Sequence, residues 1–261
     1  MLLCSQYKMR KLLYIVPLLL LFAAIGCKPR NYVIQQISPA GKRVNTLDSL
    51  NRPDSGILAL IAPYKLKLDS QMKVVIGSTS VDMPNTRPNG TLGNFIADIL
   101  KTQTQRIIKT DIDFAFTNIS GIRQPMLPEG EITKGKIFEL LPFDNMVVAA
   151  EVKGETLKKV FEQIAAKGGE AITGFKLTIK DNKLVEATYN NIPVDYTKNY
   201  VVCTTDFLFT GGDNYTMFKE GVVKEYKTGI TIRDMVMDYI YNICAVNGAL
   251  TPQPDERITI Q

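Results

Sequence analysis

The stretch YVVCTTDFLFTGGDNY, residues 200–215, joins two kinds of local structure. Its first six residues are mostly β-branched or aromatic and predict a strand over 200–205. Phe209-Thr210-Gly211-Gly212-Asp213 follows at once, and two glycines beside an Asp are typical of a plain turn. The same glycines would also let the backbone approach a ligand closely, so that the Asp213 carboxylate could accept hydrogen bonds from two vicinal hydroxyls. Both interpretations stay open for this segment alone.

Segments with helical and strand periodicity lie on both sides of this stretch. Helices are predicted over 54–72, 92–108, 155–166 and 231–247, the first with Pro63 as a possible kink. Strands are predicted over 73–77 (buried), 113–117, 145–153 and 257–260, with a hairpin formed by 175–180 and 184–189. Because helices, strands and a hairpin alternate irregularly, the sequence predicts one α/β or α+β domain with a mixed sheet over residues 54–261.

The N-terminal region has the composition of a leader followed by a tether. Basic residues precede an apolar run, Leu12 to Ile25, which is too short to span a bilayer comfortably but suits a signal peptide. The ending Ala24-Ile25-Gly26-Cys27 resembles a bacterial lipobox. Residues 1–26 are therefore predicted to be a lipoprotein signal peptide, Cys27 the lipidated residue, and 27–53 a tether. This predicts a lipid-anchored protein of the cell envelope, facing the periplasm or the cell exterior; a plain signal peptide or membrane anchor is the alternative.

Several function classes are excluded by composition. The chain of 261 residues has no His, so catalytic triads that need His and His-containing zinc or two-metal sites cannot be built from it alone. The formal charge is +5, but no long basic stretch follows the leader, and no nucleic-acid partner is expected. Cys203 and Cys244 are not at metal-ligand spacing and are interpreted as buried thiols, with a bridge between them as the alternative. No cofactor is expected in this chain.

Four stretches, in this order, carry a resemblance to a known family: residues 90–98, 118–123, 130–145 and 206–215. Together they resemble the C-terminal, substrate-binding domain of the 5′-nucleotidases, which include periplasmic UDP-sugar hydrolases and animal ecto-5′-nucleotidases. The resemblance runs from about residue 57 to the C-terminus. It implies a four-layer α/β/β/α fold that holds a nucleoside. It also implies that the divalent metals and the catalytic His lie in a separate metallophosphoesterase domain.

The resemblance assigns roles to particular residues. Phe143 and Phe207 would clamp the base between two aromatic rings, Asp213 would bind the ribose hydroxyls, and Asn118 and Arg123 would contact the ligand from their loop. Taken singly, each Phe could equally be a core residue and Arg123 a surface charge. The sequence departs from the family at the helix over 92–108, where an Arg is often found and the nearest here is Arg87. The full predicted substrate-binding set is Asn118, Gly121, Arg123, Phe143, Asn145, Phe207, Gly211, Gly212 and Asp213.

Three functions remain open at the level of sequence. The first is a nucleotide-binding half-enzyme for nucleotide catabolism that acts with a separately encoded metallophosphoesterase. The second is a non-catalytic lipoprotein that captures nucleosides or nucleotides, and the third is a structural or adhesion protein. The expected ligand is a nucleoside, nucleotide or sugar nucleotide, and the chain alone is expected to be inactive as a phosphoric monoester hydrolase.

Overall fold

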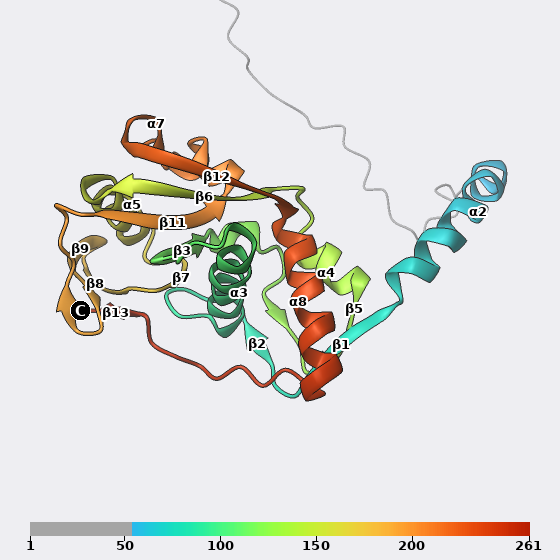
Figure 1. The fold of residues 1–261 in the computed structure, drawn as a ribbon. Coiled ribbons are helices and arrows are strands. Elements are labelled where there is room, and N and C mark those ends of the chain that lie inside the picture. The colour runs from blue at the N-terminus through green and yellow to red at the C-terminus, as the bar shows by residue number, and fades with distance from the viewer. Residues whose placement is uncertain (1–53) are drawn as a thin grey trace, which may run out of the picture. The chain divides into compact units, whose positions relative to one another are not determined.

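A mixed five-stranded sheet is the centre of the fold in the computed structural model, which describes residues 54–261 (Figure 1). The strand order is β12–β6–β11–β3–β7, where β11 and β3 are parallel and the other neighbours antiparallel. The bounds are Val222–Thr231 for β12, Met146–Lys153 for β6, Asn199–Thr205 for β11, Phe114–Thr117 for β3 and Ala171–Thr173 for β7.

Both faces of this sheet are buried at its three inner strands, β6, β11 and β3, because their side chains alternate between two apolar clusters. In β3, Phe114 and Phe116 belong to one cluster and Ala115 to the other. Helices α3 (Thr91–Ile108) and α8 (Ile232–Asn247) share the cluster of Ala115 and lie side by side (Figure 1). Helix α5 (Gly154–Ala166) shares the cluster of Phe114 with the smaller sheet.

The smaller sheet has four strands in the order β10–β9–β8–β13. Strands β8 (Lys176–Lys180) and β9 (Lys183–Tyr189) form the predicted hairpin, closed by Asp181 and Asn182 in the left-handed region. Strand β10 (Ile192–Pro193) adds to β9, and the terminal strand β13 (Ile258–Ile260) runs parallel to β8. Two further antiparallel pairs are β1 (Val75–Thr79) with β5 (Gly130–Thr133), and β2 (Met83–Pro84) with β4 (Met126–Leu127).

The predicted fold class, a mixed α/β domain, is confirmed. The sequence did not predict helix α4 (Lys134–Leu140) or the short strands β2, β4, β5, β7 and β10, and two further differences concern β1 and β12. The stretch 73–77 is not a buried strand. Apart from a single bridge between Thr79 and Leu250, β1 pairs with β5 alone among the described residues, so Val74 and Val75 stay nearly half exposed and only Ile76 of the stretch is buried. Strand β12 was not predicted, because charged and polar residues interrupt its sequence and leave no apolar run. It is nevertheless an edge strand, hydrogen-bonded to β6.

Helix α2 (Ser55–Met72) confirms the first predicted helix, with Pro63 inside it, but none of its residues is buried. Among residues 54–261, no helix is both long and apolar enough to cross a membrane. The predicted signal peptide, the lipidated Cys27 and the tether over 27–53 lie outside the described residues.

The two described cysteines are free thiols, so the alternative bridge is absent. Cys203 is buried, as predicted, whereas Cys244 is only partly buried. Cys203 is fully buried, and its Sγ lies 3.3 Å from Oγ1 of Thr104. Burial raises the pKa of this thiol to about 12, because the thiolate would lose its hydration. Cys203 is therefore a packing residue of the core.

Candidate functional site

A cavity of about 220 Å³ opens at one edge of the central sheet. It is reached by three loops: the one after β3, the one before β6, and the one after β11. Because β3 and β11 are parallel and β6 is antiparallel to β11, the carboxyl ends of the first two and the amino end of the third meet at the same edge. The lining residues are Asn118, Ser120, Gly121, Arg123, Phe143, Asn145, Phe207 and Asp213.

Two aromatic rings line the cavity and are half exposed, Phe143 at 47% and Phe207 at 43%. Such exposure is unusual for a core Phe, so the interpretation of these two residues as packing residues does not hold. Phe207 lies in the short helix α6 (Asp206–Phe209), and its ring lies against Gly212. A Cβ at Gly212 would come within 2.6 Å of the ring's Cζ, so the ring can occupy this place only beside a glycine.

The Asp213 carboxylate is held in place from several sides. Gly211 and Asp213 both have positive φ, 108° and 52°, and this turn aims the Asp side chain at the loop after β3. Its Oδ2 accepts hydrogen bonds from Nδ2 of Asn118 at 2.8 Å and from Oγ of Ser120 at 3.4 Å. Nζ of Lys167 lies 3.1 Å from the same oxygen. The turn is therefore built into the cavity wall.

The charge of this carboxylate is stabilised by its neighbours. Partial burial acts to raise the pKa of Asp213, but the hydrogen bonds from Lys167 and Asn118 and the charge of Lys167 outweigh it. The net result is a pKa below the ordinary value for Asp. Asp213 thus presents an ionised acceptor to the cavity.

The loop after β3 contains the short helix η2 (Ile119–Gly121) and is fixed from behind. Nδ2 of Asn85 donates to the carbonyls of Ile119 at 3.3 Å and Ile122 at 3.1 Å. A Cβ at Gly121 would come within 2.6 Å of Oδ1 of Asn118, which explains the glycine there. The Arg123 guanidinium donates to the Ser120 carbonyl and lies 6.0 Å from the centre of the Phe143 ring.

The structure brings together the predicted binding residues. Seven of them line the cavity directly, and the other two, Gly211 and Gly212, form the turn that holds Asp213 and Phe207. The sequence did not predict three polar residues of the site. Ser120 lines the cavity. Gln163, in α5, and Lys167, directly after that helix, contact Asp213. For Lys167, the signal in the sequence was Lys167-Gly168-Gly169-Glu170 after a predicted helix, which looks like an ordinary helix end.

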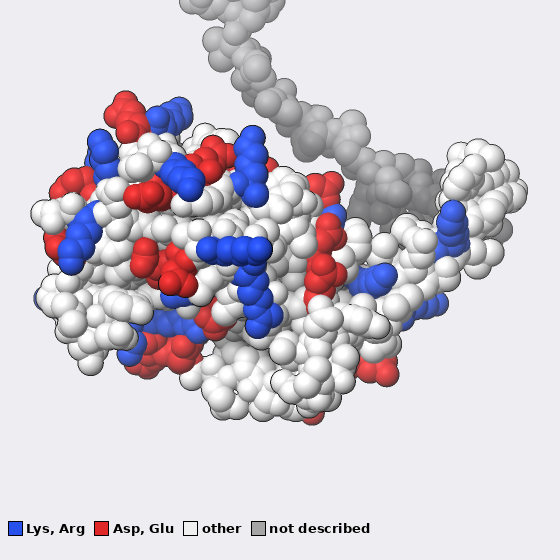
Figure 2. Space-filling model, in the orientation of Figure 1, with Lys and Arg blue, Asp and Glu red and all other residues white. Residues whose placement is uncertain are grey.

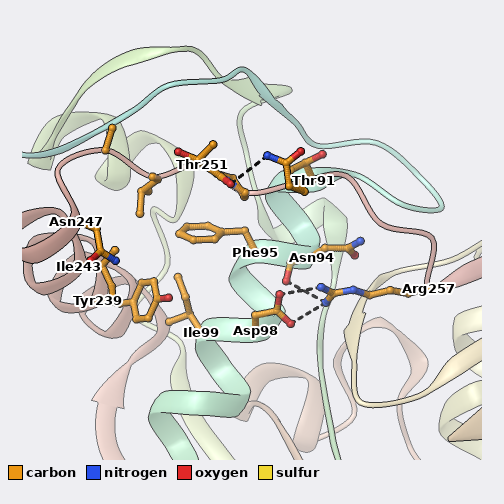
Figure 3. Close-up of a pocket in the computed structure, with 14 residues that line it drawn as sticks. Thr91, Asn94, Phe95, Asp98, Ile99, Tyr239, Ile243, Asn247, Thr251 and Arg257 are labelled. Atoms are coloured by element: carbon orange, nitrogen blue, oxygen red, sulfur yellow. Dashed lines mark hydrogen bonds and ion pairs between the residues drawn. The ribbon is translucent and has the colours of Figure 1, made fainter. Parts of the chain in front are cut away.

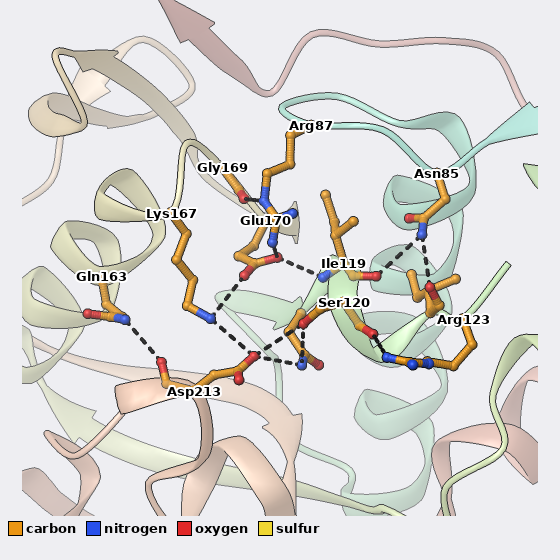
Figure 4. Close-up of polar contacts among 12 residues, drawn as sticks. Asn85, Arg87, Ile119, Ser120, Arg123, Gln163, Lys167, Gly169, Glu170 and Asp213 are labelled. Carbon is orange, nitrogen blue, oxygen red and sulfur yellow. Dashed lines mark hydrogen bonds and ion pairs between the residues drawn. The ribbon is translucent and has the colours of Figure 1, made fainter. Parts of the chain in front are cut away.

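Arg87, the arginine nearest to the α3 helix start, does not reach this cavity. Its Nε donates to the Gly169 carbonyl at 2.8 Å and its Nη2 to Oε2 of Glu170 at 3.0 Å (Figure 4). The guanidinium is therefore committed to a buried carboxylate. Arg123 is the arginine that lines the cavity.

The comparisons with known proteins agree with this geometry. The family model of the 5′-nucleotidase C-terminal domain matches residues 75–220, more than half of the chain. The chain belongs to this family. A 5′-nucleotidase-related protein of Glossina morsitans morsitans is 26% identical over 82% of this chain and 43% of its own length. A cell wall protein of Listeria monocytogenes, Lmo0130, is 25% identical over 70% of this chain and 27% of its own length.

Solved structures of the 5′-nucleotidase family share the fold. The 5′-nucleotidase precursor from Thermus thermophilus superposes with a TM-score of 0.68 over 80% of this chain and 44% of its own, at 24% identity. The chain thus spans less than half the length of these relatives. Within residues 54–261, no group of three or more Cys, Asp or Glu residues is placed to hold a metal ion. The cavity of this 5′-nucleotidase C-terminal domain supplies aromatic faces, amides, a guanidinium and a carboxylate, which are groups for binding.

A larger cavity of about 500 Å³ lies between α3 and α8 and is covered by residues 249–253 (Figure 3). Its charged groups pair with each other: Arg257 Nη2 lies 2.8 Å from Oδ2 of Asp98, and its Nε lies 2.8 Å from Asp255. The rings of Phe95 and Tyr239, which also line this cavity, meet edge to face with their centroids 5.9 Å apart. These groups satisfy one another, and the cavity contains none of the predicted binding residues.

The surface shown in Figure 2 carries basic and acidic side chains interspersed with one another. No region of one sign dominates that face, so the view gives no support to a nucleic-acid partner.

Proposed function

We propose that this domain binds the nucleoside part of a nucleoside, nucleotide or sugar nucleotide in the cavity at the sheet edge. The observation that carries the proposal is the meeting of two half-exposed rings, Phe143 and Phe207, with one ionised carboxylate, Asp213, in a single cavity. An aromatic face stacks on a nucleobase for about 1–3 kcal/mol and accepts different bases. A carboxylate can accept hydrogen bonds from the two vicinal hydroxyls of a ribose, and such charge-assisted bonds are strong.

The remaining polar groups fit the same ligand. Asn118 and Asn145 offer amide donors and acceptors to a base or sugar, and the Arg123 guanidinium offers a fork of donors. Since Arg87 is occupied by Glu170, Arg123 is the group we assign to any phosphate that reaches this cavity. The geometry therefore favours recognition of base and ribose over recognition of phosphate.

Hydrolysis is proposed to need a second protein. The chain has no His, the commonest general base in enzymes, and residues 54–261 contain no group of three or more Cys, Asp or Glu residues placed to hold a metal ion. We assign the divalent metals and the chemical step to a separately encoded metallophosphoesterase in the cell envelope. The lipid anchor predicted at Cys27 would hold the domain there, and the name of the Listeria relative, a cell wall protein, is consistent with an envelope location.

The binding proposal is tested by isothermal titration of adenosine, AMP and UDP-glucose into the purified full chain. We expect saturable binding that falls at least about thirtyfold in the Phe143→Ala/Phe207→Ala variant, because two stacking contacts of about 1–3 kcal/mol each are removed. Tyr241→Ala is the matched control, since Tyr241 is an exposed ring outside the cavity. Similar affinities for adenosine and AMP would show that the phosphate group contributes nothing to binding. Absence of binding by the unmodified chain would refute the proposal.

A further inference from the structure

A chain of alternating charges lies behind the cavity at the sheet edge (Figure 4). It runs from Arg87 to Glu170, then to Lys167, and ends at Asp213. Arg87, Glu170 and Lys167 do not line the cavity, whereas Asp213 does. The first three groups therefore do not contact a ligand in this cavity directly.

Glu170 is the anchor of this chain of charges. Its side chain is fully buried, between the end of α5 and β7. Oε2 accepts hydrogen bonds from the backbone N–H of Ile119 at 2.7 Å and from Nη2 of Arg87 at 3.0 Å. A buried carboxylate without partners would be strongly destabilising, and here a backbone donor and two cations offset part of that cost. Burial still outweighs them and raises the pKa of Glu170 above its ordinary value. Glu170 thereby ties the binding loop at Ile119 to the end of α5.

Lys167 bridges the anchor and the cavity. Its Nζ lies 3.6 Å from Oε1 of Glu170 and 3.1 Å from Oδ2 of Asp213, and the side chain is largely buried. The ammonium group also lies 5.7 Å from the centre of the buried Tyr215 ring. With a carboxylate on either side and a ring beside it, the ammonium has little freedom to move.

The two oxygens of Asp213 consequently differ. Oδ2 faces three donors: Lys167, Asn118 and Ser120. Within residues 54–261, no side chain or backbone group donates a hydrogen bond to Oδ1. A carboxylate oxygen has two lone pairs, so Oδ1 can accept two hydroxyl protons from one ligand.

We propose that Lys167, held by Glu170, is a positioning residue that engages Oδ2 of Asp213. Oδ1 is then left to accept hydrogen bonds from the two hydroxyls of a ribose. The proposal rests on the nucleoside assignment above and adds a residue that sets specificity for ribose over 2′-deoxyribose. The other charged or titratable groups near Asp213 are Glu170, Arg87, Tyr215 and, across the cavity, Arg123.

The effect on Asp213 can be measured without a ligand. The Lys167→Met variant removes the ammonium and leaves the partial burial, so the pKa of Asp213 should rise above its value in the unmodified chain. We would follow the Asp213 carboxyl carbon by ¹³C NMR, assigned with Asp213→Asn. Lys167→Arg should restore a low pKa, and Lys180→Met, at an exposed lysine of β8, should leave it unchanged.

The effect on binding is measured by titrating adenosine and 2′-deoxyadenosine over the pH range of the Asp213 titration. The unmodified chain should prefer adenosine and keep its affinity as the pH falls toward 5. Lys167→Met should bind adenosine roughly tenfold or more weakly, lose affinity at a higher pH, and lose most of the preference for ribose. An unchanged Asp213 pKa in Lys167→Met, or a uniform loss of affinity with the same pH profile and ribose preference, would overturn the positioning role. If the unmodified chain binds neither nucleoside while the pKa shift appears, the nucleoside assignment fails and the action of Lys167 on Asp213 stands.

Discussion

At the residue scale, the site depends on what glycines permit. Phe207 and Asp213 reach the same cavity because the chain turns sharply between them, with Gly211 at φ 108° and Gly212 against the Phe207 ring. A side chain at Gly212 would meet the carbonyl oxygen of Phe207 at 2.5 Å as well as the ring. The turn therefore couples the position of the aromatic face to that of the carboxylate.

The Gly212→Ala variant should lose adenosine affinity by about tenfold or more, because the new methyl group displaces the Phe207 ring and one stacking contact is worth about 1–3 kcal/mol. Titration calorimetry measures the affinity. Gly229→Ala is the control: a Cβ there meets nothing within 4 Å, but its φ of 72° is strained for Ala. The control should lose roughly 1–2 kcal/mol of stability and keep its affinity. Equal affinities for Gly212→Ala and the unmodified chain would contradict the coupling.

At the element scale, two helices of equal length differ completely in their role. Helices α2 and α3 both have 18 residues, yet α2 buries none and α3 buries nine, among them Leu92, Ile96 and Leu100. Helix α3 packs on the central sheet and beside α8, so its apolar face is removed from water. The helical spacing of apolar residues was sufficient to predict both helices, but it did not show which of them packs into the core.

Truncation of matched residues tests this difference. Ile96→Ala, at a fully buried position of α3, should lower the free energy of unfolding by about 2–5 kcal/mol, because it leaves a cavity in the core. Leu60→Ala, at a position of α2 that is 70% exposed, should change it by no more than about 0.5 kcal/mol. Urea unfolding gives both values from shifts of the midpoint at constant slope. A comparable loss for the two variants would mean that α2 is packed in solution.

At the scale of the whole molecule, binding and hydrolysis are proposed to reside in different chains. The described domain offers a cavity with binding groups, and residues 54–261 contain no cluster of Cys, Asp or Glu residues placed to hold a metal ion. A domain that only binds can still determine specificity, because the position of the nucleoside fixes where its phosphate lies relative to the catalytic groups.

The purified chain should therefore release no phosphate from AMP, with or without added Mn²⁺ or Mg²⁺. Release should begin when a metallophosphoesterase copurified from the native envelope is added, and the Phe143→Ala/Phe207→Ala variant should not support it. A colorimetric phosphate assay measures this. Hydrolysis by the chain alone would contradict the division of roles. Saturable binding without any effect on the partner's activity would instead favour a lipoprotein that captures nucleosides.

The sequence by itself determined the mixed α/β class, most helices and strands, the family, and the residues of the binding cavity. These features are local or carried by motifs in a fixed order: apolar periodicity predicts an element over its own length, and the Gly-Gly-Asp turn is formed by consecutive residues. Phe143, Phe207 and Asp213 were identified because each stands in such a motif.

Only the tertiary structure decided which elements are buried and how the site residues are held. The exposure of β1 and α2 depends on the presence or absence of neighbouring elements, and strand β12 forms because β6 offers an edge to its polar sequence. Lys167 and Glu170 escaped prediction for the same reason: their partners Asp213, Ile119 and Arg87 are remote in the chain. Long-range contacts of this kind leave no periodic signal, because the energy that fixes them comes from burial and charge pairing after the sheet has assembled.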